Sequence, residues 1–321
     1  MTDTTSFANR LGKNIKHYLK WARRNGIEAW RMYDRDIPQF PFAVDIYGDQ
    51  IHLQEYDTGR LMQPEAYEAW LAGVFDAVAF VTGFAPAHIH FKRRERQKGL
   101  QQYQKTGREG GGFIISENGR RFWVNLDKYL DTGLFLDHRN TRRKVGETAG
   151  GKRFLNLFAY TGSFSVYAAT GGAAYSETVD LSNTYLDWAK RNFELNSIDA
   201  RQHRIVRADV FQYLKTARAE GKTFDLIVMD PPSFSNSKKM PATLDIQRDH
   251  PQLIDDAMKL LASDGLMYFS NNLRSFTLSG STTERYLVKD ISKQSVPEDF
   301  RNKKIHQCWE IRHRPSEKTP S

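Results

Sequence analysis

The spacing of hydrophobic residues changes twice along the chain. Between residues 6 and 25, apolar side chains recur every three or four positions, which predicts an amphipathic helix. From Glu28 to about Leu126 the period falls to two, as in β-strands, with one helical stretch over 64–82. Beyond residue 150, short apolar runs alternate with helical patterns. The chain therefore predicts two regions of different architecture.

The first region, residues 1–126, predicts a basic helix followed by a small α+β subdomain. Gly48-Asp49 and Asn118-Gly119 are turn sequences, and the second pair is a strong hairpin signal. Pro64 near the start and Gly83 at the end delimit the single internal helix. The expected strands cover 28–34, 42–48, 50–56, 88–94, 113–119 and 120–126.

The second region, residues 127–315, predicts a Rossmann-like α/β fold with a mostly parallel sheet, because strands alternate with helices. A closing hairpin over 286–294 and 304–312 makes the last strand antiparallel, and residues 316–321 form a tail. The expected strands cover 153–160, 173–180, 203–209, 224–230 and 265–271, and the expected helices cover 162–170, 182–196, 210–220 and 245–263.

Candidate chemistry gathers at the carboxyl ends of these strands, where open α/β sheets bind ligands. Gly162 allows close approach of a ligand, Asp180 can accept both hydroxyls of a ribose, and Asp209 can accept an adenine amino proton. Helix capping is the alternative role for each aspartate. The predicted cofactor-binding residues are Asn156, Phe158, Ala159, Tyr160, Thr161, Gly162, Asp180, Leu181, Ser182, Asp209, Val210 and Asp230.

A nicotinamide cofactor would use the same fold but needs a G-x-G-x-x-G turn after the first strand. The turn in this chain reads F-A-Y-T-G-S-F and holds one glycine, so a pyrophosphate would be crowded. S-adenosyl-L-methionine carries no phosphate, and one glycine suffices for it. The pattern therefore favours a methyltransferase over a nicotinamide oxidoreductase.

The fourth strand of the second region ends in Asp230-Pro231-Pro232-Ser233-Phe234. Two prolines stiffen the chain, and Phe234 offers a stacking face for a planar base. Asp-Pro-Pro-aromatic sequences are typical of enzymes that methylate nitrogen atoms of bases. We predict Asp230, Pro231, Pro232 and Phe234 as catalytic residues; the alternative is a stiff loop with a core phenylalanine.

The charge of the chain favours a polyanionic partner. Lys and Arg outnumber Asp and Glu by 47 to 38, and the first helix carries six basic residues and no acid. We expect neither a membrane span nor a signal peptide, hence a cytoplasmic protein. Cys308 is the only cysteine, and we expect no metal. The predicted RNA-binding residues are Lys13, Lys16, Lys20, Arg93, Arg94, Arg96, Lys98, Lys105, Asn271 and Asn272.

Nine stretches give the chain a family resemblance from Phe7 to about Ile311. It resembles the guanine-N7 methyltransferases of bacterial 23S ribosomal RNA, which are commonly fused to an N2-methylating half. That half is absent here, so the chain resembles a free-standing version. The matching stretches are RERQKG, QYQK, YLDTGLFLDHR, NLFAYTGS, TVDLS, DPPSFSNSK, QRDH, FSNN and IHQCW.

The resemblance implies S-adenosylmethionine as cofactor, 23S ribosomal RNA as partner and guanine N7 as target. It also implies that Asp137, with His138 and Arg139, borders the cofactor pocket, although a structural salt bridge there is an alternative. The residues themselves leave an exocyclic amine, such as guanine N2, open as target. Cytosine C5 needs a nucleophilic cysteine and is disfavoured. A catalytically silent RNA-binding module is the remaining alternative.

Overall fold

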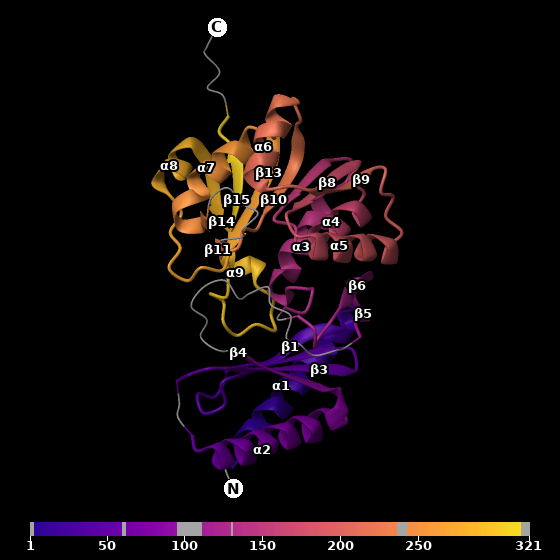
Figure 1. Ribbon diagram of the computed structural model, residues 1–321, viewed down its shortest axis with the longest axis vertical. Helices are drawn as coiled ribbons and strands as arrows, with labels where there is room; N and C mark the ends of the chain where they lie inside the picture. Colours follow the sequence, from indigo (N-terminus) through magenta and orange to yellow (C-terminus); the bar gives the residue numbers. More distant parts are fainter. Residues whose placement is uncertain (1–2, 60–61, 95–110, 130, 236–242, 316–321) are drawn as a thin grey trace. The chain divides into compact units, whose positions relative to one another are not determined.

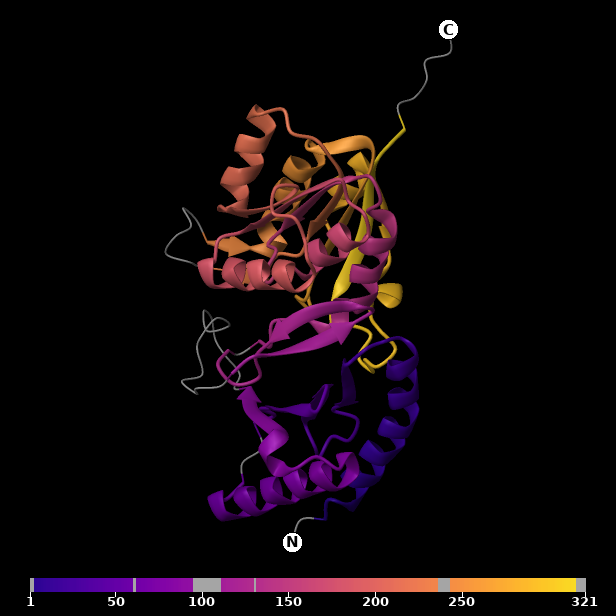
Figure 2. The ribbon, with the colours of Figure 1, turned by 90° about the vertical axis from the view of Figure 1, so that its right-hand side faces the viewer.

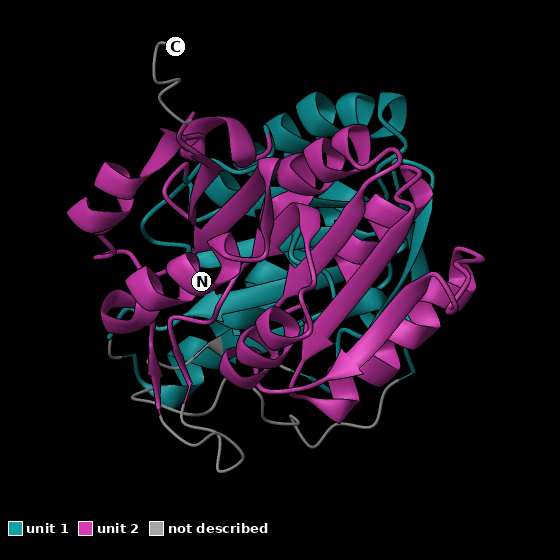
Figure 3. Cartoon of the chain, turned by 90° about the horizontal axis from the view of Figure 1, so that it is seen from above, with its two compact units in different colours: residues 1–136, 298–302 teal, residues 137–297, 303–321 magenta. Residues whose placement is uncertain are grey.

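The computed structural model describes residues 3–59, 62–94, 111–129, 131–235 and 243–315. The chain divides into two compact units (Figure 3). Unit 1 comprises Met1–Leu136 with Glu298–Asn302, and unit 2 comprises Asp137–Pro297 with Lys303–Ser321. The hydrophobic pattern predicts an earlier boundary, at residue 126, and carries no sign that 298–302 belongs to unit 1. The predicted tail, 316–321, lies outside the described residues.

Unit 1 contains a four-stranded sheet covered by two helices that share one hydrophobic core (Figure 1). Its elements are α1 (Thr5–Arg24), β1 (Ala29–Asp34), β2 (Phe42–Tyr47), β3 (Gln50–Tyr56), α2 (Pro64–Thr82), η1 (Pro86–His88) and β4 (Ile89–Arg94). The strands lie in the order β1-β2-β3-β4, with β4 parallel to β3 because α2 crosses between them. Both predicted helices and these four strands are confirmed, and Gly83 ends α2 with a φ of 74°.

The segment 298–302 belongs to unit 1 because it covers a buried charge. The Arg31 side chain on β1 donates to both carboxylate oxygens of Asp45, at 2.7 and 2.9 Å. Phe300 lies 4.4 Å from the Arg31 guanidinium, and Asp299 accepts the Arg31 backbone N–H at 2.8 Å. A buried guanidinium is stable only when it is paired and hydrogen-bonded in this way. Residues distant in sequence therefore complete the core of unit 1.

The Asn118-Gly119 turn joins β5 (Phe113–Glu117) to β6 (Arg120–Val124) in the predicted hairpin (Figure 2). Both turn residues have positive φ, 50° and 77°, as a two-residue turn of this type requires. Ile27 forms an isolated antiparallel bridge with Glu117, which ties the hairpin to the rest of unit 1.

Unit 2 contains a seven-stranded sheet in the order β14-β15-β13-β10-β7-β8-β9. The strands are β7 (Arg153–Leu157), β8 (Tyr175–Asp180), β9 (His203–Arg207), β10 (Phe224–Met229), β13 (Leu261–Asn271), β14 (Tyr286–Asp290) and β15 (Gln307–His313); the short pair β11 (Phe234–Ser235) and β12 (Leu244–Asp245) stands apart. The helices are η3 (Leu136–His138), α3 (Arg139–Thr148), α4 (Ser163–Thr170), α5 (Asn183–Leu195), α6 (Val210–Ala219), α7 (Ile246–Met258), α8 (Gly280–Arg285) and α9 (Ser292–Ser295).

The sheet of unit 2 confirms the predicted fold class. The five strands from β13 to β9 are parallel, and β15 is antiparallel to both of its neighbours. Strand order reverses between β7 and β10, which is the switch point where such sheets bind ligands. Alternate strand residues feed two cores, one with α6 and α7 and one with α3 and α4. Helices therefore cover both faces.

Helix α3, the end of α7 and the segment between β14 and β15 differ from the prediction. Helix α3 was not expected, because Val145 is its only large apolar residue. The helix predicted over 245–263 ends at Met258, and Leu261 pairs instead with Phe224 at the start of β13. The predicted antiparallel pairing of β14 and β15 is confirmed, but β14 ends at Asp290, and α9 occupies part of the range 286–294 that the pattern assigns to a strand.

The close approach of α3 and α4 depends on a glycine. A Cβ on Gly171 would lie 2.2 Å from the backbone oxygen of Gly146, so Gly171→Ala must push the helices apart. We expect a loss of about 1–3 kcal/mol in the free energy of unfolding, measured by urea denaturation. Gly280→Ala is the control, because nothing lies within 4 Å of its added Cβ. Equal stability of the two variants would show that the helix contact adapts.

Candidate functional site

The loop that leaves β7 holds three residues with positive φ. Phe158, Tyr160 and Gly162 have φ values of 56°, 51° and 71°. A side chain at Gly162 would be strained and would lie 3.0 Å from Ala189, so glycine is required there. Such conformations persist only where the surroundings enforce them, and they concentrate at functional sites.

Asp180, at the end of β8, holds this loop in place. One carboxylate oxygen accepts the backbone N–H of Tyr160 at 2.9 Å, and the other accepts that of Ser182 at 2.9 Å. Burial raises the pKa of Asp180, while these backbone hydrogen bonds lower it. Each oxygen keeps a further lone pair. The carboxylate can therefore bind a hydroxyl group without releasing the loop.

Asp209, after β9, is the N-cap of α6, and one of its oxygens accepts the backbone N–H of Gln212 at 3.2 Å. Asp209 therefore has the helix-capping role that was the alternative to cofactor binding. Its carboxylate is half-buried, and its second oxygen is not used by the cap. Ser182 caps α5 in the same manner. Val210, the first residue of α6, is 4% exposed with its side chain in the core, so only its backbone remains for a ligand.

Asp230, after β10, is contacted on both oxygens. Ser270 Oγ donates to Oδ1 at 2.7 Å, and His138 Nε2 lies 3.3 Å from Oδ2. Phe234 is 46% exposed and pairs with Asp245 between β11 and β12. The alternative of a core phenylalanine is therefore wrong. An acidic group and an exposed aromatic ring stand four residues apart on a proline-stiffened loop.

Asn271 and Asn272, at the end of β13, were both predicted to bind RNA, but their side chains have different environments. Asn272 is exposed and accepts a hydrogen bond from Ser233 Oγ at 2.6 Å, which links it to the Asp230 loop. Asn271 is 1% exposed, and its side-chain oxygen accepts the backbone N–H of Leu273. The prediction that Asn271 contacts RNA is corrected, because its side chain is closed off from solvent.

Five predicted cofactor residues have buried side chains: Asn156, Ala159, Thr161, Val210 and Arg139. The Asn156 amide donates to Ser165 Oγ at 3.0 Å, which fastens β7 to α4. Thr161 is fully buried, and its carbonyl oxygen accepts from Asn192 at 2.9 Å. The side chain of Asn156 thus serves packing. The surface of the loop comes from its strained backbone and from half-buried Phe158 and Tyr160.

The residues just before α3 lie close to the loop that contains Asp230. Asp137 accepts a hydrogen bond at 2.8 Å from His306 Nδ1, and His138 reaches Asp230. Arg139 is the first residue of α3 and is 2% exposed. Sequence reasoning assigned no role to His306. Its signal was the match of the IHQCW stretch, which named no function for the histidine.

In unit 1, the predicted RNA-binding residues Lys13, Lys16 and Lys20 are all exposed on α1. Arg10, which precedes them, forms an ion pair with Asp36 instead. No helix in the described parts of the chain combines the length and the hydrophobicity needed to cross a membrane. The exposed basic face is suited to a polyanion.

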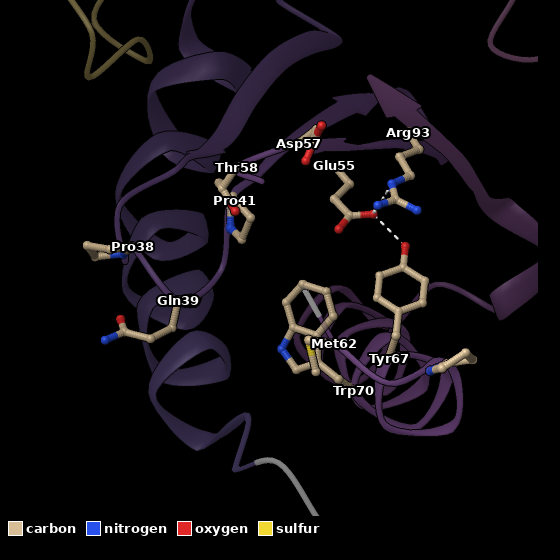
Figure 4. Close-up of a pocket in the computed structure, with 11 residues that line it drawn as sticks. Pro38, Gln39, Pro41, Glu55, Asp57, Thr58, Met62, Tyr67, Trp70 and Arg93 are labelled. Carbon is tan, nitrogen blue, oxygen red and sulfur yellow. Dashed lines mark hydrogen bonds and ion pairs between the residues drawn. The ribbon is translucent and has the colours of Figure 1, made fainter. Parts of the chain in front are cut away.

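Arg93 lines a hollow of about 320 Å³ in unit 1 (Figure 4). Its Nε lies 3.7 Å from a carboxylate oxygen of Glu55, and its guanidinium lies 5.2 Å from the ring centre of Tyr67. Tyr67 also donates to Glu55 at 2.5 Å. Arg93 is thus partly neutralised within the protein. The side chain of Arg94, and residues Arg96, Lys98 and Lys105, lie outside what the structure describes.

Three features of unit 2 define a class of protein. They are the strand order, the strained loop after β7 with its single glycine, and the aspartates at or just after the ends of β8, β9 and β10. They fit a nucleoside whose charged group is a sulfonium, because acidic acceptors surround a loop that lacks a glycine-rich phosphate cradle. The class is that of the S-adenosylmethionine-dependent methyltransferases.

Comparison with known proteins narrows this class. A family model described as S-adenosylmethionine-dependent methyltransferase matches residues 63–271. The ribosomal RNA large subunit methyltransferase K of Neisseria meningitidis serogroup B is 81% identical over 98% of this chain and 89% of the relative. The chain belongs to the family of ribosomal RNA large subunit methyltransferases K and K/L.

A longer relative belongs to the same family, and a solved methyltransferase structure shares the fold. The methyltransferase K/L of Chromohalobacter salexigens is 51% identical over 96% of this chain, which spans only 42% of that relative. The crystal structure of the SMU.776 methyltransferase complexed with SAH has a TM-score of 0.77 and 27% identity, covering 97% of this chain and 82% of that one. The fold and the cofactor class are therefore shared with a protein that binds the demethylated cofactor.

Asp180→Asn tests whether the β8 carboxylate holds the cofactor. The amide removes the charge and one acceptor, so we expect the affinity for S-adenosylmethionine to fall at least about tenfold in calorimetry. Asp187→Asn is the control, since Asp187 lies exposed on α5 and pairs with Lys190. Equal affinities of the two variants would contradict a role for Asp180 in cofactor binding.

Proposed function

We propose that this chain methylates N7 of a guanine in 23S ribosomal RNA. Its membership of the large-subunit methyltransferase family supports an RNA substrate. The observation that carries the proposal is Phe234, which is 46% exposed directly after Asp230 and two prolines. An aromatic ring held outside the core at the switch point provides a stacking face for a base.

In the proposed complex, the cofactor lies at the ends of β7, β8 and β9. Asp180 accepts the ribose hydroxyls through its remaining lone pairs. The second oxygen of Asp209 accepts an adenine amino proton, and the loop 158–162 lies against the nucleoside. Asp137 and Arg139 then border the pocket near Asp230. S-adenosylmethionine supplies an electrophilic methyl group on a sulfonium.

The residues of the chain mainly align the base. Guanine N7 carries a free lone pair at neutral pH, so no general base is needed, and catalysis rests on holding it at roughly 3–3.5 Å from the methyl group. Phe234 stacks on the base. Asp230, 23% exposed at its side chain, opposes the positive charge that develops on the ring. Asn272 stands near this loop through Ser233 and is suited to read a base edge.

Attack through cytosine C5 has no support in this site. That chemistry requires a thiolate that adds to the ring. The only cysteine, Cys308, is fully buried in β15, and burial raises its pKa well above the ordinary value. An exocyclic amine such as guanine N2 is the second candidate, because Asp230 could accept its proton. The family resemblance favours N7 over N2.

The target base must leave its helix. N7 lies in the deep, narrow major groove of A-form RNA, which side chains do not enter. The enzyme therefore acts on an unpaired or extruded guanine. We assign the surrounding RNA to the exposed basic face of α1, formed by Lys13, Lys16, Lys20, Arg23 and Arg24.

Phe234→Ala tests the stacking role. A base–aromatic stack is worth about 1–3 kcal/mol, so kcat/KM for RNA should fall roughly 5- to 150-fold. Affinity for S-adenosylmethionine should stay within twofold of the parent chain. Phe80→Ala is the matched control, because Phe80 is 86% exposed on α2 in unit 1. A similar small effect of both substitutions would argue against stacking by Phe234.

The triple variant Lys13→Ala, Lys16→Ala and Lys20→Ala tests the basic face. Each lost phosphate contact should lower the slope of log affinity against log salt by about 0.7–0.9. RNA binding should weaken while cofactor affinity is unchanged. The double variant Lys190→Ala and Lys259→Ala, which removes two paired lysines of unit 2, is the control. An unchanged salt slope would exclude contact between α1 and RNA.

The product decides the target atom. Ribosomal RNA lacking the modification is incubated with enzyme and isotopically labelled cofactor, digested to nucleosides and analysed by mass spectrometry. We expect labelled 7-methylguanosine. Labelled N2-methylguanosine would show that the exocyclic amine, and not N7, is the target. Labelled 5-methylcytidine would refute the conclusion that buried Cys308 excludes attack through cytosine C5. Cofactor binding without labelled product on any RNA would favour the silent binding module.

A further inference from the structure

Two contacts restrain the carboxylate of Asp230 within unit 2. Ser270 Oγ donates to Oδ1 at 2.7 Å, and His138 Nε2 lies 3.3 Å from Oδ2. The two contacts fall on different oxygens, so together they oppose rotation of the carboxylate about its last bond. Ser270 is a strand residue of β13, whereas His138 comes from η3, far away in sequence. In the part of the chain that the structure describes, His138 therefore connects Asp230 to the segment preceding α3.

His138 is itself held in place by aromatic contacts. Its ring stacks on that of His306, with centroids 4.2 Å apart and an interplanar angle of 8°. Phe164, in the first turn of α4 next to the strained loop, also contacts His138. The centroids of these two rings lie 5.7 Å apart, and the angle between their planes is 67°. His138 thus touches both the residue that follows the cofactor loop and the carboxylate of the Asp-Pro-Pro-Ser-Phe motif.

His306 is fixed at both ring nitrogens. Nδ1 lies 2.8 Å from Asp137 Oδ2, and Nε2 lies 2.8 Å from Ser295 Oγ. The ring is 1% exposed, so these bonds stand in a solvent-free environment where they are strong. His306 therefore forms a rigid plate against which the His138 ring lies.

This cluster does not suit a metal ion, although the ligand atoms of Asp137, His138 and His306 lie within 4.8 Å of one another. The lone pair of an imidazole nitrogen lies in the plane of its ring. Two parallel stacked rings direct their lone pairs along separate planes, whereas a tetrahedral site needs them to converge. Both nitrogens of His306 are moreover already in hydrogen bonds.

The proton of His138 can be placed by its neighbours. Burial lowers the pKa of His138, so the ring is neutral at neutral pH and carries one proton. Nδ1 has no hydrogen-bond partner among the described residues, and Nε2 faces a carboxylate, which can only accept. The proton therefore resides on Nε2, where it is directed at Asp230.

We propose that the stacked pair His138 and His306 positions Asp230 for methyl transfer. His306, anchored by Asp137 and Ser295, sets the plane of His138. His138 then donates from Nε2 to Asp230 and orients the carboxylate toward the bound base. The inference rests on the proposed function for the role of Asp230 at the base. Neither histidine needs to touch the substrate, so both are positioning residues.

The test compares two substitutions of His138 in the full-length chain. His138→Phe keeps a flat ring against His306 but lacks the donor. His138→Gln places an amide donor at the reach of Nε2. The measured quantity is total label transferred from S-adenosylmethionine to ribosomal RNA, whichever nucleoside carries it. A product other than 7-methylguanosine would thus overturn the N7 assignment and leave this test intact.

For His138→Phe we expect kcat to fall about 10- to 100-fold, because small misplacements of a catalytic group carry losses of that size. The KM for RNA and the calorimetric affinity for the cofactor should stay within threefold. His138→Gln should recover kcat to within about threefold of the parent chain. His203→Phe is the control: His203 is a buried histidine of β9 that bonds Ser176 and lies outside this cluster. Its kcat should change less than twofold.

Two outcomes would overturn the proposal. One is a parental kcat for His138→Phe. The other is a loss of kcat that is equal in both His138 variants and follows their melting temperatures. Ring-nitrogen NMR of the unsubstituted protein provides a readout without any variant. A neutral His138 with its proton on Nε2 is expected, and a proton on Nδ1 or on both nitrogens would refute the assignment.

Discussion

The hydrogen bond from the backbone of Tyr160 to Asp180 is the constraint on which the site depends. It ties the end of β8 to a loop in which Phe158 and Tyr160 adopt a backbone conformation that side chains disfavour. The Tyr160 ring also packs edge-on against Tyr185 of α5, with ring centres 4.5 Å apart. The cost of the strained loop is thus offset by contacts from two neighbouring elements. Without them the loop would relax, and the proposed nucleoside site would lose its shape.

A second restraint operates at the end of β10, which lies on the other side of β7 from β8. Asp230 is held by Ser270, and the loop after it is joined to Asn272 through Ser233. The proposed cofactor side and the proposed base side of the site are therefore fixed separately, by hydrogen bonds that belong to different strands. His138 is the described residue that contacts both sides, through Phe164 and through Asp230. Rigidity of this kind is what alignment chemistry requires.

Much of the fold follows from local pattern. The α2 helix, the Asn118-Gly119 hairpin and the parallel strands of unit 2 were predictable, because each has a clear period and explicit end signals. The acidic strand ends were predictable for the same reason. Helix α3 was not, since a helix that packs through glycine and one valine leaves no hydrophobic stripe. The end of α7 was predicted too late because the residues after Met258 have a pattern that suits a helix and a strand equally.

The side-chain environment was harder to predict than the positions. Asn156 and Asn271 lie at strand ends and have the right chemistry for binding, yet tertiary contacts bury both. Asp209 caps α6 through one carboxylate oxygen and leaves the other available, so the capping role and the proposed binding role are compatible. The IHQCW stretch contained His306 but indicated no role for it, because that role depends on a ring that stacks on a residue more than 160 positions earlier. Such pairings exist only once the chain has folded.

The placement of residues 298–302 in unit 1 has a consequence for synthesis of the protein. Arg31 is synthesised early, whereas Asp299, which accepts its backbone N–H, follows 268 residues later in the chain. Strand β15, which lies between β13 and β14 in the sheet of unit 2, emerges later still. Unit 1 can therefore complete its core only after residues 298–302 have been translated. A product truncated before residue 298 would leave the Arg31–Asp45 pair without its cover in unit 1 and the β13 edge without β15 in unit 2.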